Sequence, residues 1–289
     1  MIPSSELIIN SDGSIFHLHL QPHQLADTII LVGDPSRVEV VASRFSKVHH
    51  SVSNREFVTQ TGEYKGHPVT ALATGIGTDN LDIVINELDA LANIDLATRE
   101  PKAQHRQLTL LRLGTSGALQ PDIALGSYVS SHVSIGFDGL LNFYAHRNSI
   151  SLLEMERAFC DYVQWNPLCA KPYFAPNSER LIKLFADSTV EGMTAVASGF
   201  YGPQGRVLRL PLADPKLNEK IAAFRYQGKR ITNFEMEGSA IAGLGALLGH
   251  ETLTICTIIA NRAAKDMNVD YKKAVDGMID MALAKLFGA

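Results

Sequence analysis

Short apolar runs alternate along this chain with segments whose apolar residues recur at helical spacing. Several runs are apolar throughout, which is typical of strands buried on both faces of a sheet. Each is followed by a glycine or a polar turn, which predicts where the strand ends. The predicted strands are Thr28–Val32, Val69–Ala73, Leu108–Leu113, Tyr128–Ile135, Met193–Ala197 and Leu253–Ala260.

Helices are predicted between these runs. Apolar residues recur every three or four positions from Leu81 to Ala92 and from Tyr271 to Leu286. The stretch Gly238–Leu248 is rich in Ala, Leu and Gly, as in a helix packed tightly against a sheet. The alternation predicts one α/β domain over residues 1–289, with a central mixed sheet flanked by helices. Ligands in such folds usually bind beyond the carboxyl ends of the strands.

Composition narrows the class of protein and its partners. With 289 residues, of which 46% are hydrophobic, the chain can bury one large core. A formal net charge of -4 provides no basic field for nucleic acid or an anionic membrane. Cys160, Cys169 and Cys256 form no CxxC pair or disulfide framework, and no signal peptide or membrane-spanning run is visible. We therefore expect a cytoplasmic protein whose ligands are small molecules.

The first polar motif is Gly33-Asp34-Pro35-Ser36-Arg37, which directly follows a predicted strand. The glycine permits a tight turn, and the proline can open a helix. Arg37, one turn into that helix, could bind an oxyanion with its fork of donors. Taken alone, the motif is more typical of an ordinary strand-to-helix turn with a solvated arginine.

In the second motif Arg112 stands inside an apolar strand that is followed by Gly114-Thr115-Ser116-Gly117. A buried guanidinium needs a partner, because an unpaired buried charge is costly. The hydroxyls and glycine amides beside it would suit a phosphate cradle. The alternative is an internal salt bridge with a glutamate further along the chain.

The third motif runs from Phe200 to Arg206 and carries an aromatic ring, turn formers and two planar polar side chains. Gln204 offers both a donor and an acceptor, which matches the imide edge of a pyrimidine. Arg206 could support a carbonyl that gains negative charge, and Phe200 supplies a face for stacking. The alternative is a plain loop with an exposed arginine.

The fourth motif, Asn233–Gly238, precedes the alanine-rich helix. If this stretch is extended, Glu235 and Glu237 point to the same side and could face a ligand rich in hydroxyls. Paired carboxylates also occur in glycoside hydrolases and metal sites, but no histidine cluster at ligand spacing accompanies them here. The remaining alternative is acidic capping of the helix N-terminus.

In this order the four motifs resemble the nucleoside phosphorylase family of the hexameric type, and within it the uridine phosphorylases. The likeness extends from Ile15-Phe16-His17-Leu18 to Asn261-Arg262. It implies the phosphorylase/hydrolase-like α/β/α fold and a pentosyltransferase of pyrimidine salvage. The implied reaction is reversible phosphorolysis of uridine to uracil and α-ribose 1-phosphate through an oxocarbenium-like transition state, with deoxyuridine and thymidine as further candidate substrates. Inorganic phosphate is then a co-substrate, and no cofactor is implied.

The resemblance also assigns roles to individual residues. It implies a phosphate site of Gly33, Arg37, Arg55, Arg112 and Thr115. It implies a ribose site of His17, Glu235, Met236 and Glu237, and a base site of Phe200, Gln204 and Arg206. Catalysis would depend on Arg206, Gln204 and Arg37. Because Arg55 and His17 match residues that a neighbouring subunit contributes, a homo-oligomer is implied, either a dimer or a hexamer built of dimers.

Two stretches depart from the family pattern, and the second lies beside the base site and could alter selectivity. The stretch Gly75–Asn80 replaces the family's glycine-rich turn with Pro-Ser, beside a monovalent-cation site that Glu56, Ile76 and Asn80 would form and that allows K⁺. Gly202-Pro203 stands where uridine phosphorylases commonly have Pro-Gly.

The comparison with purine-directed relatives favours a pyrimidine. Purine-directed relatives place an aspartate near Asn261-Arg262, where this chain has none, although Asp266 follows closely. The segment Leu140–Pro176 matches the family least and has no assigned role. The alternatives are a purine nucleoside phosphorylase, a nucleoside hydrolase and a non-catalytic nucleoside-binding protein.

Overall fold

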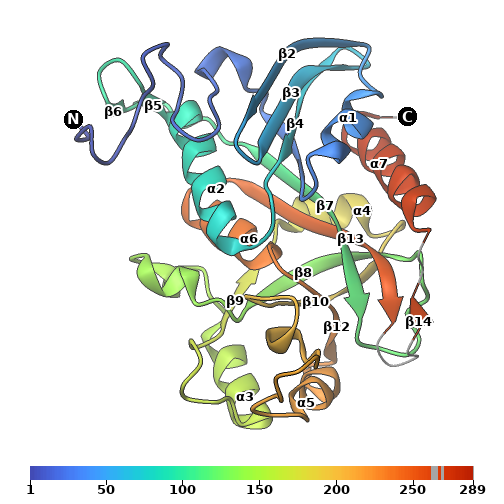
Figure 1. Ribbon diagram of the computed structural model, residues 1–289. Coiled ribbons are helices and arrows are strands. Elements are labelled where there is room, and N and C mark those ends of the chain that lie inside the picture. Colours follow the sequence, from blue (N-terminus) through green and yellow to red (C-terminus); the bar gives the residue numbers. More distant parts are fainter. Residues whose placement is uncertain (262–265, 268–269, 289) are drawn as a thin grey trace.

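The computed structural model describes residues 1–261, 266–267 and 270–288. A large mixed sheet crosses the molecule, and helices cover it on both sides (Figure 1). Its main path runs β11-β12-β10-β8-β13-β7-β1-β4-β3-β2, with β14 on β13 and β9 on β8. Its strands are β1 Thr28–Val32, β2 Lys47–Asn54, β3 Phe57–Tyr64, β4 His67–Ala73, β7 Thr109–Ala118, β8 Tyr128–Gly136, β9 Tyr173–Pro176, β10 Val190–Val196, β11 Arg225–Tyr226, β12 Lys229–Glu235, β13 Glu251–Asn261 and β14 Asp266–Met267.

The α-helices and the shorter elements complete the fold. The α-helices are α1 Ser36–Ala42, α2 Thr78–Asn93, α3 Leu153–Val163, α4 Glu179–Phe185, α5 Leu217–Ala223, α6 Gly238–Leu247 and α7 Lys272–Phe287. A separate pair of short strands, β5 Ile94–Asp95 and β6 Glu100–Pro101, follows α2. The 3-10 helices are η1 Pro22–Gln24, η2 Leu140–Phe143, η3 Arg147–Ser149 and η4 Gly202–Gln204. Among the described residues no helix is long and apolar enough to cross a membrane.

The two faces of the sheet are buried by different helices. Successive side chains of a strand point to opposite faces, so neighbouring residues of β1 enter different cores. Leu31 joins the core formed with α2 and α6, whereas Ile30 joins the core formed with α1, α4 and α7. This confirms the predicted α/β/α arrangement and explains why β1 is apolar throughout.

Part of the sheet closes into a ring. β7 pairs in parallel with β13, which continues through β8 and β10 to β12. β12 returns to β7 through the antiparallel pairs Phe234–Gly117 and Asn233–Ala118. Closure leaves no free edge on these strands, and it brings the ends of β7 and β12 together.

The strand and helix predictions are confirmed, with one error. Thr28–Val32 is β1 with the same bounds, and the other predicted strands and helices overlap observed ones. The predicted turn at Gly114-Thr115-Ser116-Gly117 is wrong, because β7 continues through it to Ala118. Gly114 serves a close approach instead, since a Cβ there would lie 2.2 Å from Nη1 of Arg112.

Candidate active site

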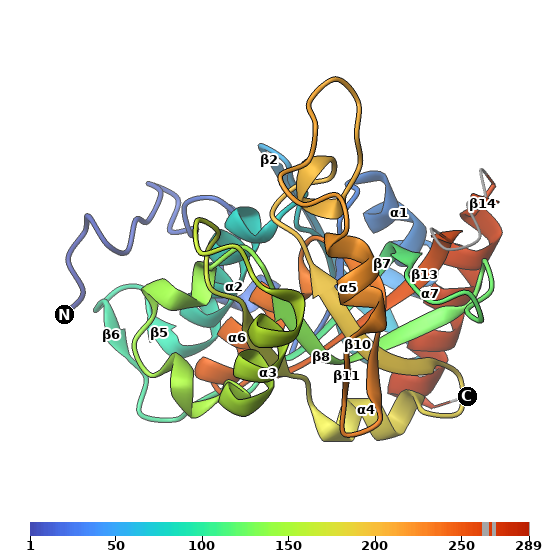
Figure 2. The ribbon, with the colours of Figure 1, turned by 90° about the horizontal axis from the view of Figure 1, so that it is seen from below.

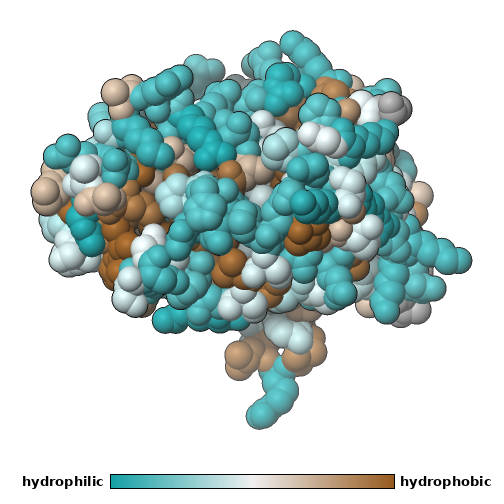
Figure 3. Space-filling model, turned by 90° about the horizontal axis from the view of Figure 1, so that it is seen from above, coloured by the Kyte–Doolittle hydropathy of each residue, from teal (hydrophilic) through white to brown (hydrophobic). Residues whose placement is uncertain are grey.

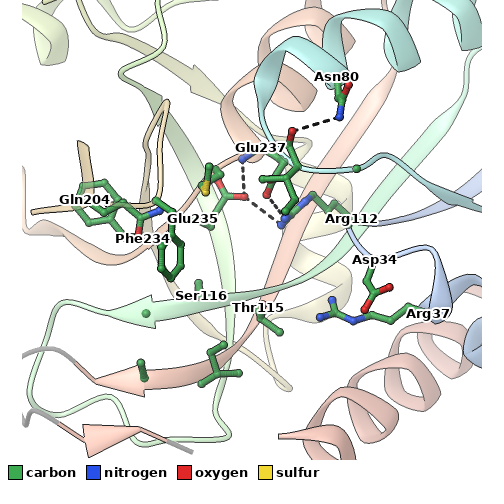
Figure 4. A pocket seen from close by; sticks show the side chains of 18 of the residues that line it. Asp34, Arg37, Asn80, Arg112, Thr115, Ser116, Gln204, Phe234, Glu235 and Glu237 are labelled. Atoms are coloured by element: carbon green, nitrogen blue, oxygen red, sulfur yellow. Dashed lines mark hydrogen bonds and ion pairs between the residues drawn. The ribbon is translucent and has the colours of Figure 1, made fainter. Parts of the chain in front are cut away.

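A cavity of about 1010 Å³ opens where β1, β7, β12 and β13 end. All four sequence motifs contribute to its wall, although they are spread over about 200 residues of the chain. The predicted site residues that line it are Gly33, Arg37, Arg112, Thr115, Phe200, Gln204, Arg206, Glu235, Met236 and Glu237. Figure 4 shows most of the polar ones pointing toward a common space. Two predicted residues, His17 and Arg55, do not line it.

Arg112 is held between two carboxylates at the base of the cavity (Figure 4). Its Nη1 lies 3.1 Å from Oε2 of Glu235, and its Nη2 pairs with Oε2 of Glu237. The Arg112 side chain is only 4% exposed, so the pairing is nearly free of solvent. The internal salt bridge that the sequence offered as an alternative is therefore present.

The two glutamates are fixed by backbone donors as well. Glu235 accepts the N–H groups of Glu237 and Gly238 at 3.0 and 2.8 Å, which satisfies the start of α6. Glu237 accepts the N–H of Gly77 at 2.8 Å from the loop before α2. Helix capping and a carboxylate pair on the cavity wall thus occur together rather than as alternatives.

Burial perturbs the ionisation of this cluster. Burial raises the pKa of Glu235 to about 7, against the opposing charge of Arg112. Burial also raises the pKa of the Cys256 thiol to about 12, so this cysteine beside Arg112 is neutral. Burial alone would lower the pKa of Arg112, but the carboxylates of Glu237 and Glu235 raise it, so the guanidinium stays charged.

A second group of donors lies across from this cluster. Gly33 follows β1, and Thr115 lies on β7, which pairs with β1 in parallel. Arg37 enters from the first turn of α1 and points toward Thr115 (Figure 4). Asp34 accepts the backbone N–H of Ser36 at 2.9 Å, which shapes the turn between β1 and α1. A guanidinium, a hydroxyl and a glycine amide here suit a small anion.

The opposite end of the cavity is built from the segment around η4. Nη1 of Arg206 donates to the carbonyl of Phe200 at 2.6 Å and to Oε1 of Gln204 at 2.7 Å. The guanidinium lies 3.7 Å from the centre of the Phe200 ring. Burial lowers the pKa of Arg206 from its ordinary value.

Gln204 is 3% exposed even though it belongs to a surface segment. Asn218 of α5 donates to its carbonyl at 2.9 Å, and Gly205 adopts φ 71° beside that asparagine. A Cβ at Gly205 would lie 2.2 Å from Nδ2 of Asn218, so both space and conformation require glycine there. Because Oε1 of Gln204 faces Arg206, its amide NH₂ is directed the other way.

The segment that continues from Arg206 projects from the molecule between η4 and α5 (Figure 2). Val207, Leu208 and Leu210 are 57%, 75% and 82% exposed. Figure 3 shows the same projection at its lower edge, with apolar and polar surface together. The wall of the cavity is thus formed by the sheet at one end and by the segment that leads into an exposed loop at the other.

The three residues expected around a monovalent cation are close neighbours on the cavity wall. Nδ2 of Asn80 donates to the carbonyl of Ile76 at 3.3 Å. Gly75, at φ 70°, brings them together, because a Cβ there would lie 2.5 Å from Asn80 and 3.5 Å from Glu56. Their oxygen atoms are of the type that alkali cations prefer, and the cation itself stays a prediction.

Three potential metal ligands also meet away from the cavity, namely Asp89, His105 and His250. The N–H of Leu108 points to Nδ1 of His250 at 3.2 Å, so Nδ1 accepts and Nε2 carries the proton of the neutral ring. Nε2 lies 3.2 Å from Asp89. A metal at Nε2 would have to displace this proton while Nδ1 stays engaged by Leu108, so the arrangement indicates an internal polar contact.

Sequence reasoning missed the apolar wall of the cavity. Phe234, Ile259, Ala260 and Met267 line it beside the polar groups. Phe234 was not expected there, because strand alternation predicts that it points to the opposite side from Glu235. Arg262 lies outside the described residues, as does the side chain of Asp266, so the purine-selective position is not described.

The fold and the cavity define an α/β protein whose ligand site combines arginines, a carboxylate pair and a planar amide. The sequence model of the Phosphorylase superfamily matches residues 27–287. The chain belongs to this family.

Relatives with assigned activities lie within the same family. The chain is 26% identical to a uridine phosphorylase of Thermococcus kodakarensis over 269 residues, covering 91% of this chain and 83% of the relative. It is 28% identical to the uridine phosphorylase of Escherichia coli over 266 residues, covering 89% and 90%. The crystal structure of a Trypanosoma brucei nucleoside phosphorylase, described as showing uridine phosphorylase activity, is 30% identical with a TM-score of 0.89, covering 98% of this chain and 100% of that one. The resemblance noted in the sequence is thereby confirmed.

Proposed function

We propose that the protein is a uridine phosphorylase that converts uridine and inorganic phosphate reversibly into uracil and α-ribose 1-phosphate. The observation that carries the proposal is the Gln204–Arg206 pair, fixed at 2.7 Å and covered by Phe200 in the cavity that also contains Arg112. Deoxyuridine and thymidine present the same imide edge and are further candidate substrates. The activity of the relatives supports this assignment.

In this proposal phosphate binds between Gly33, Arg37, Thr115 and Arg112, with Arg55 added by a neighbouring subunit. A guanidinium carries five N–H donors, so the ion pairs of Arg112 with Glu235 and Glu237 leave donors for a phosphate oxygen. Arg37 is catalytic because it orients the attacking anion below C1′. The nucleophile is phosphate itself, and no side chain has to form a covalent bond.

The ribose is assigned to Glu237, Met236 and Glu235, with His17 reaching from the neighbouring subunit. Carboxylates accept the hydrogens of the 2′ and 3′ hydroxyls, and the pairing with Arg112 keeps Glu237 in place. Negative charge beside the sugar also favours the positive charge that develops on the ring as the bond to the base breaks.

The departing base gains negative charge in the transition state. Arg206 and Gln204 donate to its oxygen and nitrogen atoms, and these hydrogen bonds strengthen as the charge grows. Phe200 stacks against the ring. This selective stabilisation of the leaving group is the catalytic role that we assign to Arg206 and Gln204.

The enzyme needs no cofactor in this proposal, and a K⁺ ion at Glu56, Ile76 and Asn80 would act structurally. We propose a homo-oligomer, a dimer or a hexamer built of dimers, because His17 and Arg55 do not line the cavity of their own chain. We place the protein in the cytoplasm, since its three cysteines are free thiols, and we assign no nucleic acid or membrane partner.

An absorbance assay of uridine, thymidine and inosine, each with and without phosphate, tests the proposal. We expect cleavage of uridine that depends on phosphate and exceeds cleavage of inosine. Faster cleavage of inosine would instead establish a purine nucleoside phosphorylase. Cleavage without phosphate would indicate a hydrolase, and binding without cleavage would indicate a nucleoside-binding protein.

A further inference from the structure

Glu87 of α2 makes an unusually complete set of contacts with the segment that carries His17. Its Oε2 accepts the backbone N–H of Leu18 at 2.8 Å, and both oxygens accept the backbone N–H of His17 at 3.0 and 3.1 Å. Its Oε1 also lies 2.6 Å from Nδ1 of the His17 ring. One carboxylate thus holds both the backbone and the side chain of the same histidine.

These contacts decide which ring nitrogen carries the proton. An ionised carboxylate only accepts hydrogen bonds, so Nδ1 of His17 must donate. In a neutral imidazole Nε2 is then an acceptor with a free lone pair. Asn54 donates to the His17 carbonyl at 2.7 Å, which fixes the chain from the other side.

His17 does not line the large cavity of its own chain. It lines a second, smaller cavity of about 260 Å³ together with Phe16 and Glu87. The Phe16 ring lies 4.7 Å from the His17 ring, and the Arg55 guanidinium lies 5.7 Å from the Phe16 ring. The two residues that the proposed function takes from a neighbouring subunit therefore share one surface.

We propose that Glu87 is a positioning residue for His17, holding its ring so that Nε2 accepts the hydrogen of the nucleoside 5′-hydroxyl in a neighbouring subunit. This inference rests on the proposed function and deepens it. The 5′-hydroxyl lies far from the breaking bond, so its binding orients the sugar and raises kcat/KM without taking part in the chemistry. Glu87 touches no substrate atom.

The test compares Glu87→Gln with wild type on uridine, 5′-deoxyuridine and 5′-amino-5′-deoxyuridine. The second substrate has no 5′ donor, and the third, when protonated, has donors only. A glutamine can turn its NH₂ toward Nδ1, which places the ring proton on Nε2. We expect the variant to lose about tenfold in kcat/KM on uridine, more on the amino compound, and less than twofold on 5′-deoxyuridine.

Matched variants separate positioning from general damage. Glu6 lines the same second cavity and is exposed. Glu6→Gln should therefore leave kcat/KM on each of the three substrates within twofold of wild type. His17→Ala should show the same substrate selectivity as Glu87→Gln, and the double variant should lose little more. An equal loss on uridine and 5′-deoxyuridine would show that Glu87 only supports the fold, and would overturn the inference.

A second measurement needs no change at Glu87. Solid-state ¹⁵N spectra of histidine-labelled protein, with the His17 signals assigned by their loss in His17→Asn, report which ring nitrogen is protonated. We expect protonation at Nδ1 alone, and a proton on Nε2 would contradict the inference. Wild-type protein that does not cleave uridine with phosphate would overturn the proposed function and, with it, this inference. Active wild-type protein whose Glu87→Gln variant lacks the expected substrate selectivity would overturn this inference alone.

Discussion

Arg112 and Arg206 face the same cavity but are supported in opposite ways. Arg112 lies on β7, 4% exposed, between two carboxylates that the backbone also holds. Arg206 lies on a surface segment and is held by a carbonyl, an amide oxygen and the face of a half-exposed phenylalanine. The first arginine is part of the structure of the sheet, whereas the second can change without damaging the fold. We call the part of the cavity around Arg112 the sheet end and the part around Arg206 the loop end. We expect the sheet end to perform the function common to the family and the loop end to determine which base is bound.

The sharpest test of this contrast is Arg112→Met. Removing the guanidinium leaves Glu235 and Glu237 buried without their counter-charge, which should cost about 3–5 kcal/mol of unfolding free energy and abolish turnover. Urea unfolding at a fixed protein concentration measures the loss. The control is Arg230→Met. The side chains of Arg230 and its partner Asp122 are 32% and 59% exposed, so this ion pair should contribute under about 1 kcal/mol to the unfolding free energy. Equal losses of unfolding free energy in the two variants would show that Arg112 is no more important to the fold than an exposed arginine.

The sheet end should also make stability depend on pH. The pKa of Glu235 is raised by burial from 4.5 to about 7, so the folded state holds this proton more tightly than the unfolded state does. The resulting stabilisation is complete below pH 4.5 and is lost as pH rises through 7, about 3 kcal/mol in all. Glu235→Gln should lack this dependence. The measurement is the difference in unfolding free energy between the two proteins from pH 5 to pH 8, and a constant difference would contradict the prediction.

At the loop end, Arg206→Ala should lower turnover of uridine about 100-fold, because a donor to the leaving base is lost. The KM for phosphate should stay within about threefold, and the unfolding free energy should change by less than about 0.5 kcal/mol. Steady-state kinetics and urea unfolding measure these effects. Arg209→Ala, on the same exposed segment, is the matched control. Unchanged turnover with weaker phosphate binding would assign Arg206 to the anion instead.

The smallest effect is expected from Phe200→Leu. The ring lies 3.7 Å from the Arg206 guanidinium, and a cation–π contact at such a partly exposed site contributes about 0.5–1 kcal/mol. The variant should lose about three- to fivefold in kcat/KM for uridine, whereas Phe200→Tyr should keep the wild-type value. A loss of stability in Phe200→Leu would show that the loop end is structural after all.

The sequence predicted best what depends on local burial. The β1 strand and the helices α2 and α7 follow from continuous or periodic apolar positions, which report directly on the packing of each element. The sequence also placed Glu235 and Glu237 on one side and offered an ion pair for Arg112. It did not reveal that both glutamates would share that one arginine.

Long-range pairing could not be predicted. The β2–β3 hairpin was missed because most of β2 is polar and exposed, so it has no apolar pattern. The turn expected at Gly114–Gly117 was wrong because β13 and β12 pair with both sides of that stretch. A local run of glycine, threonine and serine gives no signal of partners more than a hundred residues away.

The ring of strands has a consequence for the order in which the molecule is made. β13 lies between β7 and β8 in the ring but is the last of the five to leave the ribosome. A nascent chain that stops before Glu251 therefore holds Arg112 on β7 and Glu235 on β12, with Glu237 just after it, before their central neighbour β13 exists. Contacts across such sequence distances form slowly. We therefore expect the cavity to be among the last parts of the chain to fold, and a stalled or truncated chain to expose these charges without the cavity that surrounds them.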